Sequence, residues 1–381
     1  MGKRQKLVVS SPKKSQRETS IEIPVDVLID IFSMLPLEAV ARCRCVSKMW
    51  SSVLRHGDCT QVYLKKSSVR PRMLFTLLCN GKRIVYSIPQ DLDPNRDYAT
   101  PITPYYQMHF PKGLHGYYEV CRPSILGFFC TESRKPMICN PSTGEYLSLP
   151  IATSKRHQTR TCFGYDPNAK LFKVLSLSDD YVCRVATIAT EKVTWRRVEC
   201  SRPHQAIDTE ICIDGVLYYL AEHRRTHYMI ACFDIRVESY KFVDVDWLQS
   251  WSSALVNYHG KLGILFPTYP SFPLHGPEGF ELRVLEDVDE ARWSKTVYIL
   301  PDGWKHLATD SHRDIVGMTS AGEIVLSNYF LMEEPFYVYY FNTVKNTVVQ
   351  VQIDFGIVAK KAYCPRIVTL INHVENVELM D

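Results

Sequence analysis

Three short helical patterns follow one another in residues 23–54, and together they are too short to enclose a hydrophobic core of their own. Pro24 stands where the first turn of a helix tolerates proline, because the amide hydrogen it lacks would have no partner there. Pro36 ends the first helix, since the residue before a proline is driven out of the helical region. Apolar residues recur at helical spacing in the first and third patterns, at Val27, Leu28, Ile31, Phe32, Leu35, Val46, Trp50, Val53 and Leu54. So wide an apolar face on so small a unit predicts a partner surface that covers it.

Three features of this run stand at the spacing of a known motif. They are Ile-Pro-x-Asp at residues 23–26, the Leu35-Pro36 break, and the segment RCVSKMW at residues 44–50. With these features residues 21–56 resemble an F-box, and the F-boxes of plant proteins in particular. The resemblance implies docking on a Skp-type adaptor, which joins the protein to a cullin and a ubiquitin-transfer module. The residues expected to contact the adaptor are Pro24, Val27, Leu28, Ile31, Leu35, Pro36, Val46 and Trp50. Periodicity alone also allows an ordinary helical hairpin whose stripe packs on its own domain.

The composition is that of a soluble globular protein with one large domain or two to three smaller ones. Of the 381 residues, 46% are hydrophobic and 23% charged, and the net charge is only +4. So small an excess indicates no nucleic-acid partner. No run reaches the roughly 20 apolar residues that a membrane span needs, and no apolar segment follows the N-terminal charges as in a signal peptide. We therefore expect neither a nucleic-acid nor a membrane partner.

Residues 1–20 are polar, basic and without periodicity, so we expect a disordered tail. Its two basic clusters, residues 3–6 and 13–14, fit either a nuclear import signal or a solvated tail without an address. The thirteen cysteines are scattered and include no C-x-x-C pair. Free, buried thiols in a reducing compartment are therefore expected, which places the protein in the nucleus, the cytoplasm or both.

A long all-β pattern follows a connector at residues 57–72, with no long amphipathic helix beyond residue 60. Short runs rich in Val, Ile, Tyr, Phe and Thr alternate with turn residues. The strands predicted are 73–78, 83–88, 127–130, 172–177, 182–187, 216–221, 229–234, 261–266, 281–285, 323–326, 336–341 and 347–353. This β-domain is expected to span residues 73–355, with a separate C-terminal segment at 356–381.

A weak internal repeat runs through the β pattern. Polar turns recur at residues 139–146, 189–195, 233–240, 286–293 and 341–347, and glycine turns at 214–215, 259–260 and 321–322. The spacing of roughly 45 to 55 residues is that of four-stranded propeller blades. A pair of β-sandwiches is the alternative architecture.

The phrases CNPSTGEYLSLP, CFGYDPNAKLFKVL, ICIDGVLYYLA and FDIRVESYKFVDV resemble the F-box-associated domain of plant F-box proteins, which is kelch-like in organisation. The likeness covers nearly all of residues 70–355 and implies a propeller-like interaction domain. Residues 120–130 depart from the family pattern, which weakens the assignment of the first blade.

No motif of a catalytic, cofactor or metal site is present. The chain lacks G-x-S-x-G, a P-loop, G-x-G-x-x-G and H-E-x-x-H. His223 and His227 suggest either a zinc site or a solvated loop tip, and the loop tip is the simpler reading. The Pro- and Tyr-rich insert at residues 91–119 is long for a loop, so it either carries function or packs along the domain. We expect no catalytic residue, no cofactor and no metal.

Together these features predict a non-enzymatic substrate receptor of an SCF-type (Skp–cullin–F-box) ubiquitin ligase, with a client protein that the sequence does not identify. A charged residue in place of Leu28 or Pro36 is expected to abolish adaptor binding and leave the β-domain folded. The alternative is a glycan- or small-ligand-binding propeller protein whose F-box is secondary, suggested by loop aromatics such as Tyr105, Tyr106 and Trp251. A hydrolase built on a propeller is a third possibility, but its expected catalytic turn is missing.

Overall fold

The structure is a computed structural model, and the following residues are described. They are 23–79, 82–91, 106–109, 125, 129–131, 136–152, 159–188, 193–223, 227–248, 253–268, 279–304, 313–328, 335–356 and 367–378. The predicted tail at residues 1–20 and most of the insert at 91–119 lie outside this set.

Four helices open the described chain: α1 (Val25–Met34), α2 (Leu37–Arg44), α3 (Lys48–Arg55) and α4 (Gly57–Ser68). Pro24 and Pro36 directly precede α1 and α2, as the sequence predicts. Ser47 caps α3, because its hydroxyl accepts a hydrogen bond from the Trp50 amide at 3.1 Å. None of the described helices is long and apolar enough to cross a membrane.

Helix α4 corrects the prediction of a connector without helix at residues 57–72. Cys59 and Tyr63 of α4 are buried in the same core as Leu28, Val40 and Leu54 of the first three helices. The helix was missed because its apolar positions are few and separated by polar residues, so its own periodicity is weak. The helical unit therefore extends to Ser68.

The rest of the described chain is all-β and forms six sheets, five of them with four strands. The first has the order β23-β1-β2-β3, with β1 (Arg72–Cys79), β2 (Lys82–Pro89), β3 (Tyr106–His109) and β23 (Ile367–His373). The three-stranded sheet contains β4 (Phe129–Thr131), β5 (Met137–Asn140) and β6 (Glu145–Ser148). The next has the order β10-β9-β8-β7, with β7 (Thr159–Asp166), β8 (Leu171–Ser178), β9 (Cys183–Ile188) and β10 (Trp195–Val198).

Three further four-stranded sheets follow in chain order. The first contains β11 (Gln205–Ile213), β12 (Val216–His223), β13 (His227–Asp234) and β14 (Ser239–Asp244). The second contains β15 (Ala254–Tyr258), β16 (Lys261–Thr268), β17 (Gly279–Asp287) and β18 (Arg292–Ile299). The third contains β19 (Arg313–Met318), β20 (Glu323–Asn328), β21 (Phe336–Asn342) and β22 (Thr347–Ile353). The strand pairs of these three sheets are antiparallel. The predicted fold class, helices followed by a propeller-like β-domain, is confirmed.

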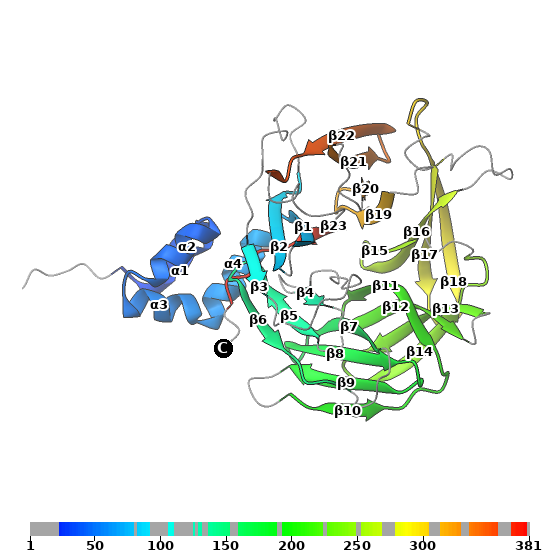
Figure 1. The fold of residues 1–381 in the computed structure, drawn as a ribbon, viewed down its shortest axis with the longest axis horizontal. Coiled ribbons are helices and arrows are strands. Elements are labelled where there is room, and N and C mark those ends of the chain that lie inside the picture. The colour runs from blue at the N-terminus through cyan, green and yellow to red at the C-terminus, as the bar shows by residue number, and fades with distance from the viewer. Residues whose placement is uncertain are drawn as a thin grey trace, which may run out of the picture.

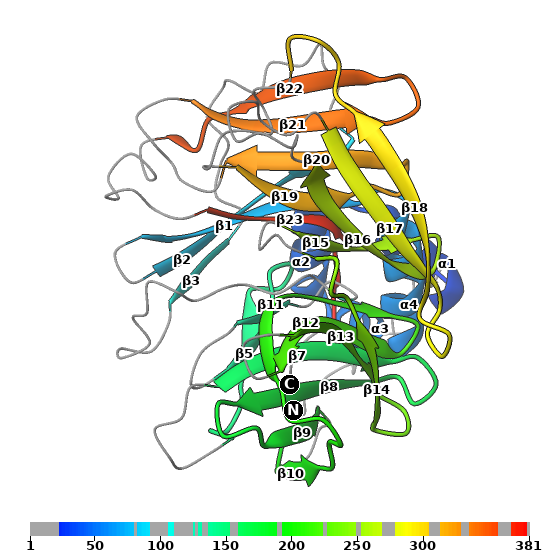
Figure 2. The ribbon, with the colours of Figure 1, turned by 90° about the vertical axis from the view of Figure 1, so that its right-hand side faces the viewer.

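The sheets stand around a common centre, and their innermost strands contact one another from β4 through β7, β11, β15 and β19 to β23 (Figures 1 and 2). Strand β23 pairs with β1, so the last described strand completes the first sheet. A separate C-terminal segment at residues 356–381 was therefore the wrong division, since this range contains a strand of the propeller. The error arose because β23 pairs with a strand nearly three hundred residues away, which local periodicity does not reveal.

The repeated turns are built alike. An Asn or Asp ends the strand before each of four polar turns: Asn140 after β5 of the three-stranded sheet, and Asp234, Asp287 and Asn342 after the third strand of a four-stranded sheet. In each case the side-chain oxygen accepts a hydrogen bond from the main-chain amide two residues later. Gly215, Gly260 and Gly322 have φ of 75°, 84° and 81°, the left-handed region that glycine adopts without strain. The polar and glycine turns of the predicted repeat therefore occupy equivalent places in successive sheets.

Candidate functional site

The helical unit carries an exposed apolar surface. Seven of the fifteen large hydrophobic side chains that are exposed among the described residues lie between positions 23 and 49. They define the apolar F-box face: Ile23, Val25, Val27, Ile31, Met34, Val46 and Met49. Val46 is 62% and Met34 60% exposed, whereas the other exposed hydrophobic residues are Val69, directly after α4, and residues scattered over the β-domain. A cluster of this kind on a small helical unit marks an interaction surface.

The predicted adaptor residues divide between this face and the core beneath it. Val27, Ile31 and Val46 are exposed apolar side chains of the face, and Pro24 and Pro36 are also exposed. The half-buried residues are Leu35 and Trp50, which pack against the helical core. Four residues of the face were missed: Ile23, Val25, Met34 and Met49.

Leu28 is wrongly placed by the sequence prediction, because only 1% of it is exposed. It packs in the core with Phe32 at the next helical turn. The apolar residues of α1 thus lie on two sides of the helix: Leu28 and Phe32 are buried in the helical core, and Val27 and Ile31 are exposed. A charge at position 28 is expected to unfold the helical unit rather than to test docking.

Side-chain contacts hold the helices in fixed positions beneath the face. The rings of Phe32 and Trp50 meet edge to face with centroids 5.1 Å apart, which joins α1 to α3. Lys66 of α4 donates a hydrogen bond of 2.7 Å to the Ser33 hydroxyl of α1. The face is therefore preformed by its own core.

Residues 374–378, which we call the C-terminal strap, join the helical unit to the β-domain. Val377 is buried in the helical core, and its carbonyl accepts a hydrogen bond from Arg44 of α2. The amide of Glu375 donates to the Ser67 hydroxyl of α4 at 2.9 Å, and its carboxylate lies 3.3 Å from the Arg72 guanidinium of β1. One short segment thus contacts α2, α4 and β1 directly after β23, and the helices lie beside the first sheets (Figure 1).

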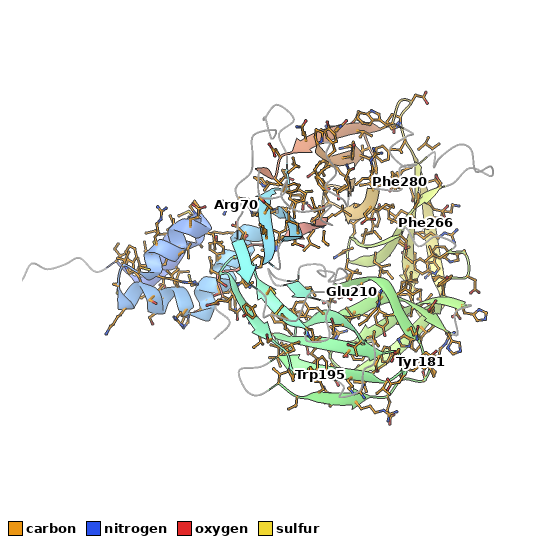
Figure 3. All side chains as sticks on the ribbon, viewed as in Figure 1. Arg70, Tyr181, Trp195, Glu210, Phe266 and Phe280 are labelled. Atoms are coloured by element: carbon orange, nitrogen blue, oxygen red, sulfur yellow. The ribbon has the colours of Figure 1, made fainter. Side chains whose placement is uncertain are left out.

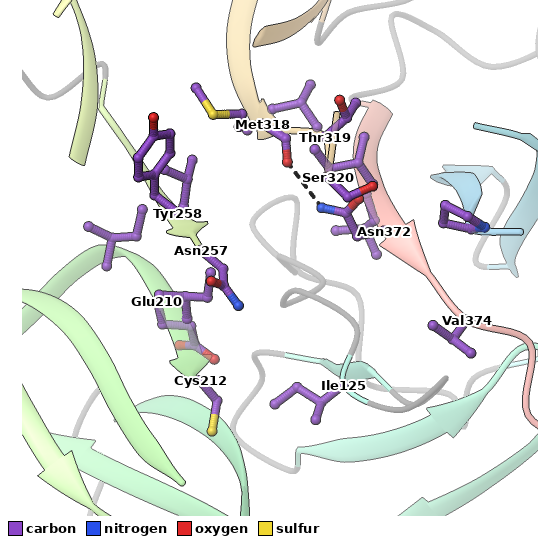
Figure 4. A pocket seen from close by; sticks show the side chains of 18 of the residues that line it. Ile125, Glu210, Cys212, Asn257, Tyr258, Met318, Thr319, Ser320, Asn372 and Val374 are labelled. Atoms are coloured by element: carbon purple, nitrogen blue, oxygen red, sulfur yellow. Dashed lines mark hydrogen bonds between the residues drawn. The ribbon is translucent and has the colours of Figure 1, made fainter. Parts of the chain in front are cut away.

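A cavity of about 540 Å³ lies among the innermost strands of the propeller. Side chains of β11, β15, β19 and β23 line it, among them Glu210, Asn257, Met318 and Asn372 (Figure 4). Glu210 is 5% exposed and lies at the inner edge of the sheets (Figure 3), where its carboxylate accepts a hydrogen bond of 3.0 Å from the Phe163 amide. Asn372 donates to the Met318 carbonyl at 3.1 Å across the wall of the cavity. The volume is in the range of small-ligand sites.

A second cluster, which the sequence did not single out, joins Cys183, Cys200 and His204. Their sulfur and ring-nitrogen atoms lie within 4.8 Å of one another. Three such donors are chemically suited to a soft metal ion. However, both ring nitrogens of His204 already have oxygen partners. Nδ1 lies 2.8 Å from the Arg202 carbonyl oxygen, and Nε2 lies 2.6 Å from the Tyr219 hydroxyl. The spacing C-x₃-H at residues 200–204 was the only sequence signal.

Two protein families match the chain in the places that this architecture predicts. Residues 21–58 match the family described as F-box-like, and residues 72–374 match the F-box associated beta propeller domain. The chain belongs to the F-box proteins with an F-box associated propeller domain. The resemblance to plant F-box proteins is thereby confirmed, and the propeller match ends at residue 374, beyond β23.

The relatives of this F-box protein are similar over their whole length. The F-box protein At3g47030 of Arabidopsis thaliana is 51% identical, with 100% of this chain and 95% of the relative covered. The Arabidopsis E3 ubiquitin-protein ligase SGIP1 is 41% identical over 98% of both chains, and the Arabidopsis F-box protein DOR is 37% identical over 99% of both. Among solved structures, TolB from Acinetobacter baumannii matches with a TM-score of 0.44 at 11% identity over 86% of this chain and 73% of TolB, too weak a likeness to inform function.

Proposed function

We propose that this F-box protein is the substrate-recognition subunit of an SCF-type E3 ubiquitin ligase. The apolar F-box face docks on a Skp-type adaptor, which is joined to a cullin, and the propeller binds the client protein. The observation that carries the proposal is the clustering of exposed apolar side chains on a preformed helical unit. The similarity to a relative named as an E3 ubiquitin-protein ligase supports it.

The energetics of docking favour this face. Full burial of a Val, Ile or Met side chain contributes about 1.5–3 kcal/mol. The summed contribution of several such side chains exceeds the association cost of roughly 4–15 kcal/mol only if few other groups of the protein become ordered on binding. The packed core beneath Val27 and Ile31 meets this condition, because the helices need not refold on binding.

The protein itself performs no bond chemistry in this proposal and needs no cofactor. It accelerates ubiquitin transfer by holding a client lysine near the transfer enzyme, which raises the effective concentration of the reactants. The C-terminal strap suits this role, since it fixes the adaptor-binding helices against the propeller that holds the client. We place the protein in the nucleus, the cytoplasm or both, where such ligases meet their clients.

The test is co-purification of the full chain with a Skp adaptor and a cullin. Ile31→Asp puts a charge in the middle of the apolar F-box face, at a side chain that is 38% exposed. Val344→Asp makes the same kind of change at an 89% exposed position of the propeller and serves as the matched control. The complex should form with wild type and Val344→Asp and be lost with Ile31→Asp. Failure of folded wild type to bind the adaptor would refute the proposal.

The cavity among the inner strands favours a second candidate function, the binding of a glycan or another small ligand. Its 540 Å³ volume and the buried Glu210 carboxylate are suited to a small molecule with hydroxyl or amino groups. Retention of the full chain on a glycan array, lost on Asn257→Leu in the cavity wall, would support this function. A blank array with folded protein would remove the glycan version of it.

A further inference from the structure

Two thiols approach each other at the outer side of the sheet formed by β7 to β10. Cys183 begins β9 and pairs with Val198, the last residue of β10, and Cys200 follows two residues later. The two sulfur atoms lie within 4.8 Å of each other. Cys183 is 4% exposed, whereas Cys200 is half-buried. Cys200 is therefore the less sheltered residue of the pair.

His204 is fixed beside the Cys200 thiol. Its Nδ1 lies 3.6 Å from the Cys200 sulfur and 2.8 Å from the Arg202 carbonyl, and its Nε2 lies 2.6 Å from the Tyr219 hydroxyl. The Tyr219 hydroxyl in turn lies 3.3 Å from the Tyr240 hydroxyl. Because oxygen atoms already occupy both ring nitrogens, the imidazole acts as a hydrogen-bonding neighbour of the sulfur rather than as an open metal ligand.

The two sulfur atoms differ in their acidity. Hydrogen bonding from Cys183, and then from His204, lowers the pKa of the Cys200 thiol against the penalty of burial. The hydrogen bond to Cys200, together with burial, raises the pKa of Cys183. The other titratable groups that face the pair are Cys162 of β7, Tyr219 of β12 and Tyr240 of β14, together with His204. The Cys200 thiol, which donates a hydrogen bond of 3.1 Å to the Arg202 carbonyl, is thus the more acidic member of a close pair, the arrangement found at redox-reactive cysteine pairs.

We propose that Cys200 and Cys183 form a peroxide-reactive thiol pair. The Cys200 sulfur attacks one oxygen of hydrogen peroxide, so that an S–O bond forms, the O–O bond breaks and water leaves after protonation. The Cys183 sulfur then attacks the resulting sulfenic acid, its proton goes to the departing hydroxyl, and a second water leaves as the disulfide forms. Two thiols are oxidised by two electrons and one peroxide is reduced to two waters. Thiol exchange with two equivalents of a reductant such as glutathione then returns both cysteines to thiols and leaves the reductant as its disulfide.

The backbone allows the required movement. A disulfide needs the sulfur atoms about 2.05 Å apart, so one thiol must shift from its present position. The pairing between β9 and β10 ends at Val198, and the chain bends at residues 201–202, so the segment that carries Cys200 lies outside the paired strands. Oxidation would therefore tie this segment to the start of β9.

The first test treats the full chain with one equivalent of hydrogen peroxide, blocks the remaining thiols and maps disulfides by peptide mass spectrometry. The proposal predicts a Cys183–Cys200 linkage that dithiothreitol reverses and that is absent from Cys200→Ser. In Cys183→Ser, dimedone should trap the sulfenic acid at Cys200 at least tenfold more than at Cys45, an exposed thiol of the helical unit. Equal trapping at the two positions, or folded wild type without the linkage, would overturn the proposal.

A second measurement needs no variant and so does not depend on whether a substitution folds. Alkylation by iodoacetamide at pH 6 reports the thiolate form, which is less than about 1% of a thiol of ordinary pKa near 8.5, so a thiol of lowered pKa reacts faster at this pH. Cys200 should be alkylated at least tenfold faster than Cys45 at this pH. Cys200 alkylation no faster than that of Cys45, or protection of both Cys183 and Cys200 that only a metal chelator removes, would contradict the proposal.

Discussion

The side-chain amide of Asn140, at the end of β5, donates hydrogen bonds to the main-chain carbonyls of Asn376 at 3.1 Å and Glu378 at 2.8 Å. Asn140 is fully buried, and its own oxygen accepts from the Ser142 amide at 2.9 Å, as in the equivalent turns of other sheets. Asn140 therefore stabilises the polar turn after β5 and also binds the C-terminal strap through its side-chain amide. The strap in turn reaches the helical core through Val377.

Asn140→Ala should destabilise the protein more than the same change at an equivalent turn. It removes two hydrogen bonds to the strap, each contributing about 1 kcal/mol, besides the bond within the turn. We expect a loss of roughly 2–3 kcal/mol in urea unfolding, together with faster digestion of the C-terminus by carboxypeptidase. Asn342→Ala removes the same kind of turn hydrogen bond, together with a part-buried one of 3.2 Å to the Glu323 carboxylate, without touching the strap, and should cost about 1 kcal/mol. Equal costs and equal digestion would show that the strap contributes nothing.

Val377→Ala should loosen the helical unit and leave the propeller unchanged. The valine is 1% exposed and packs with residues of the helical core, so truncation leaves a small cavity that costs about 2 kcal/mol. Hydrogen exchange should accelerate in α1 to α4 and stay constant in β12 and β13. Val344→Ala, at an 89% exposed position, is the control and should change neither region. Unchanged protection of the helices in Val377→Ala would mean that the strap does not support them.

Alanine substitutions at Leu28 and Ile31 should distinguish the side of α1 that stabilises the helical unit from the side that is exposed. Leu28→Ala is expected to lower the stability of the helical unit by about 2–5 kcal/mol, because a buried core side chain is lost. Ile31→Ala, one turn away on the exposed side, should change stability by no more than about 0.5 kcal/mol. Hydrogen exchange of the α1 amides measures both. A comparable loss in the two variants would contradict the division of α1 into an inner and an outer surface.

Stability should fall in acid through His373. Burial, and then the nearby charge of Arg72, lowers the pKa of His373 to about 3 in the folded protein, below its ordinary value of 6.5. Between these values the unfolded chain binds a proton that the folded chain does not, so the contribution is complete above pH 6.5 and is lost as the pH falls toward 3. The loss approaches about 1.4 kcal/mol per pH unit at its steepest.

The measurement is the pH dependence of urea unfolding between pH 7 and pH 5. His373→Gln should have a shallower slope than wild type, because glutamine does not titrate. His227→Gln changes an exposed histidine and should keep the wild-type slope. A slope in His373→Gln as steep as in wild type would show that His373 is not the residue responsible.

The strands that the sequence predicted are mostly the second and third of each sheet, such as β12, β13, β16 and β17. These strands have neighbours on both sides and read as apolar runs with strand-forming residues. Most of the innermost strands, which stand at the edge of their sheets, were missed, and two of them carry irregularities. Glu210 follows a register shift in β11, and Gly317 marks another in β19.

The proposed adaptor-binding surface was predictable from the sequence as a region, but less so residue by residue. Proline positions and helical spacing located the apolar stripe, but spacing alone does not tell which side of α1 meets its own core. Leu28 and Ile31 are three positions apart and differ in exposure from 1% to 38%. The partners that decide this, Tyr63 of α4 and Val377 of the strap, come from outside the F-box pattern. The Cys183–Cys200–His204 cluster likewise depends on strand pairing that local sequence does not show.

The most direct test of the central claim is the affinity of the purified full chain for a Skp-type adaptor, measured by calorimetry. We predict that Ile31→Asp weakens binding at least a hundredfold, which is about 2.7 kcal/mol, because a charge then replaces an apolar side chain at the interface. Val344→Asp should bind as wild type does, and both variants should unfold at the wild-type urea concentration. Wild-type affinity in folded Ile31→Asp would contradict the assignment of the apolar F-box face as the adaptor-binding surface.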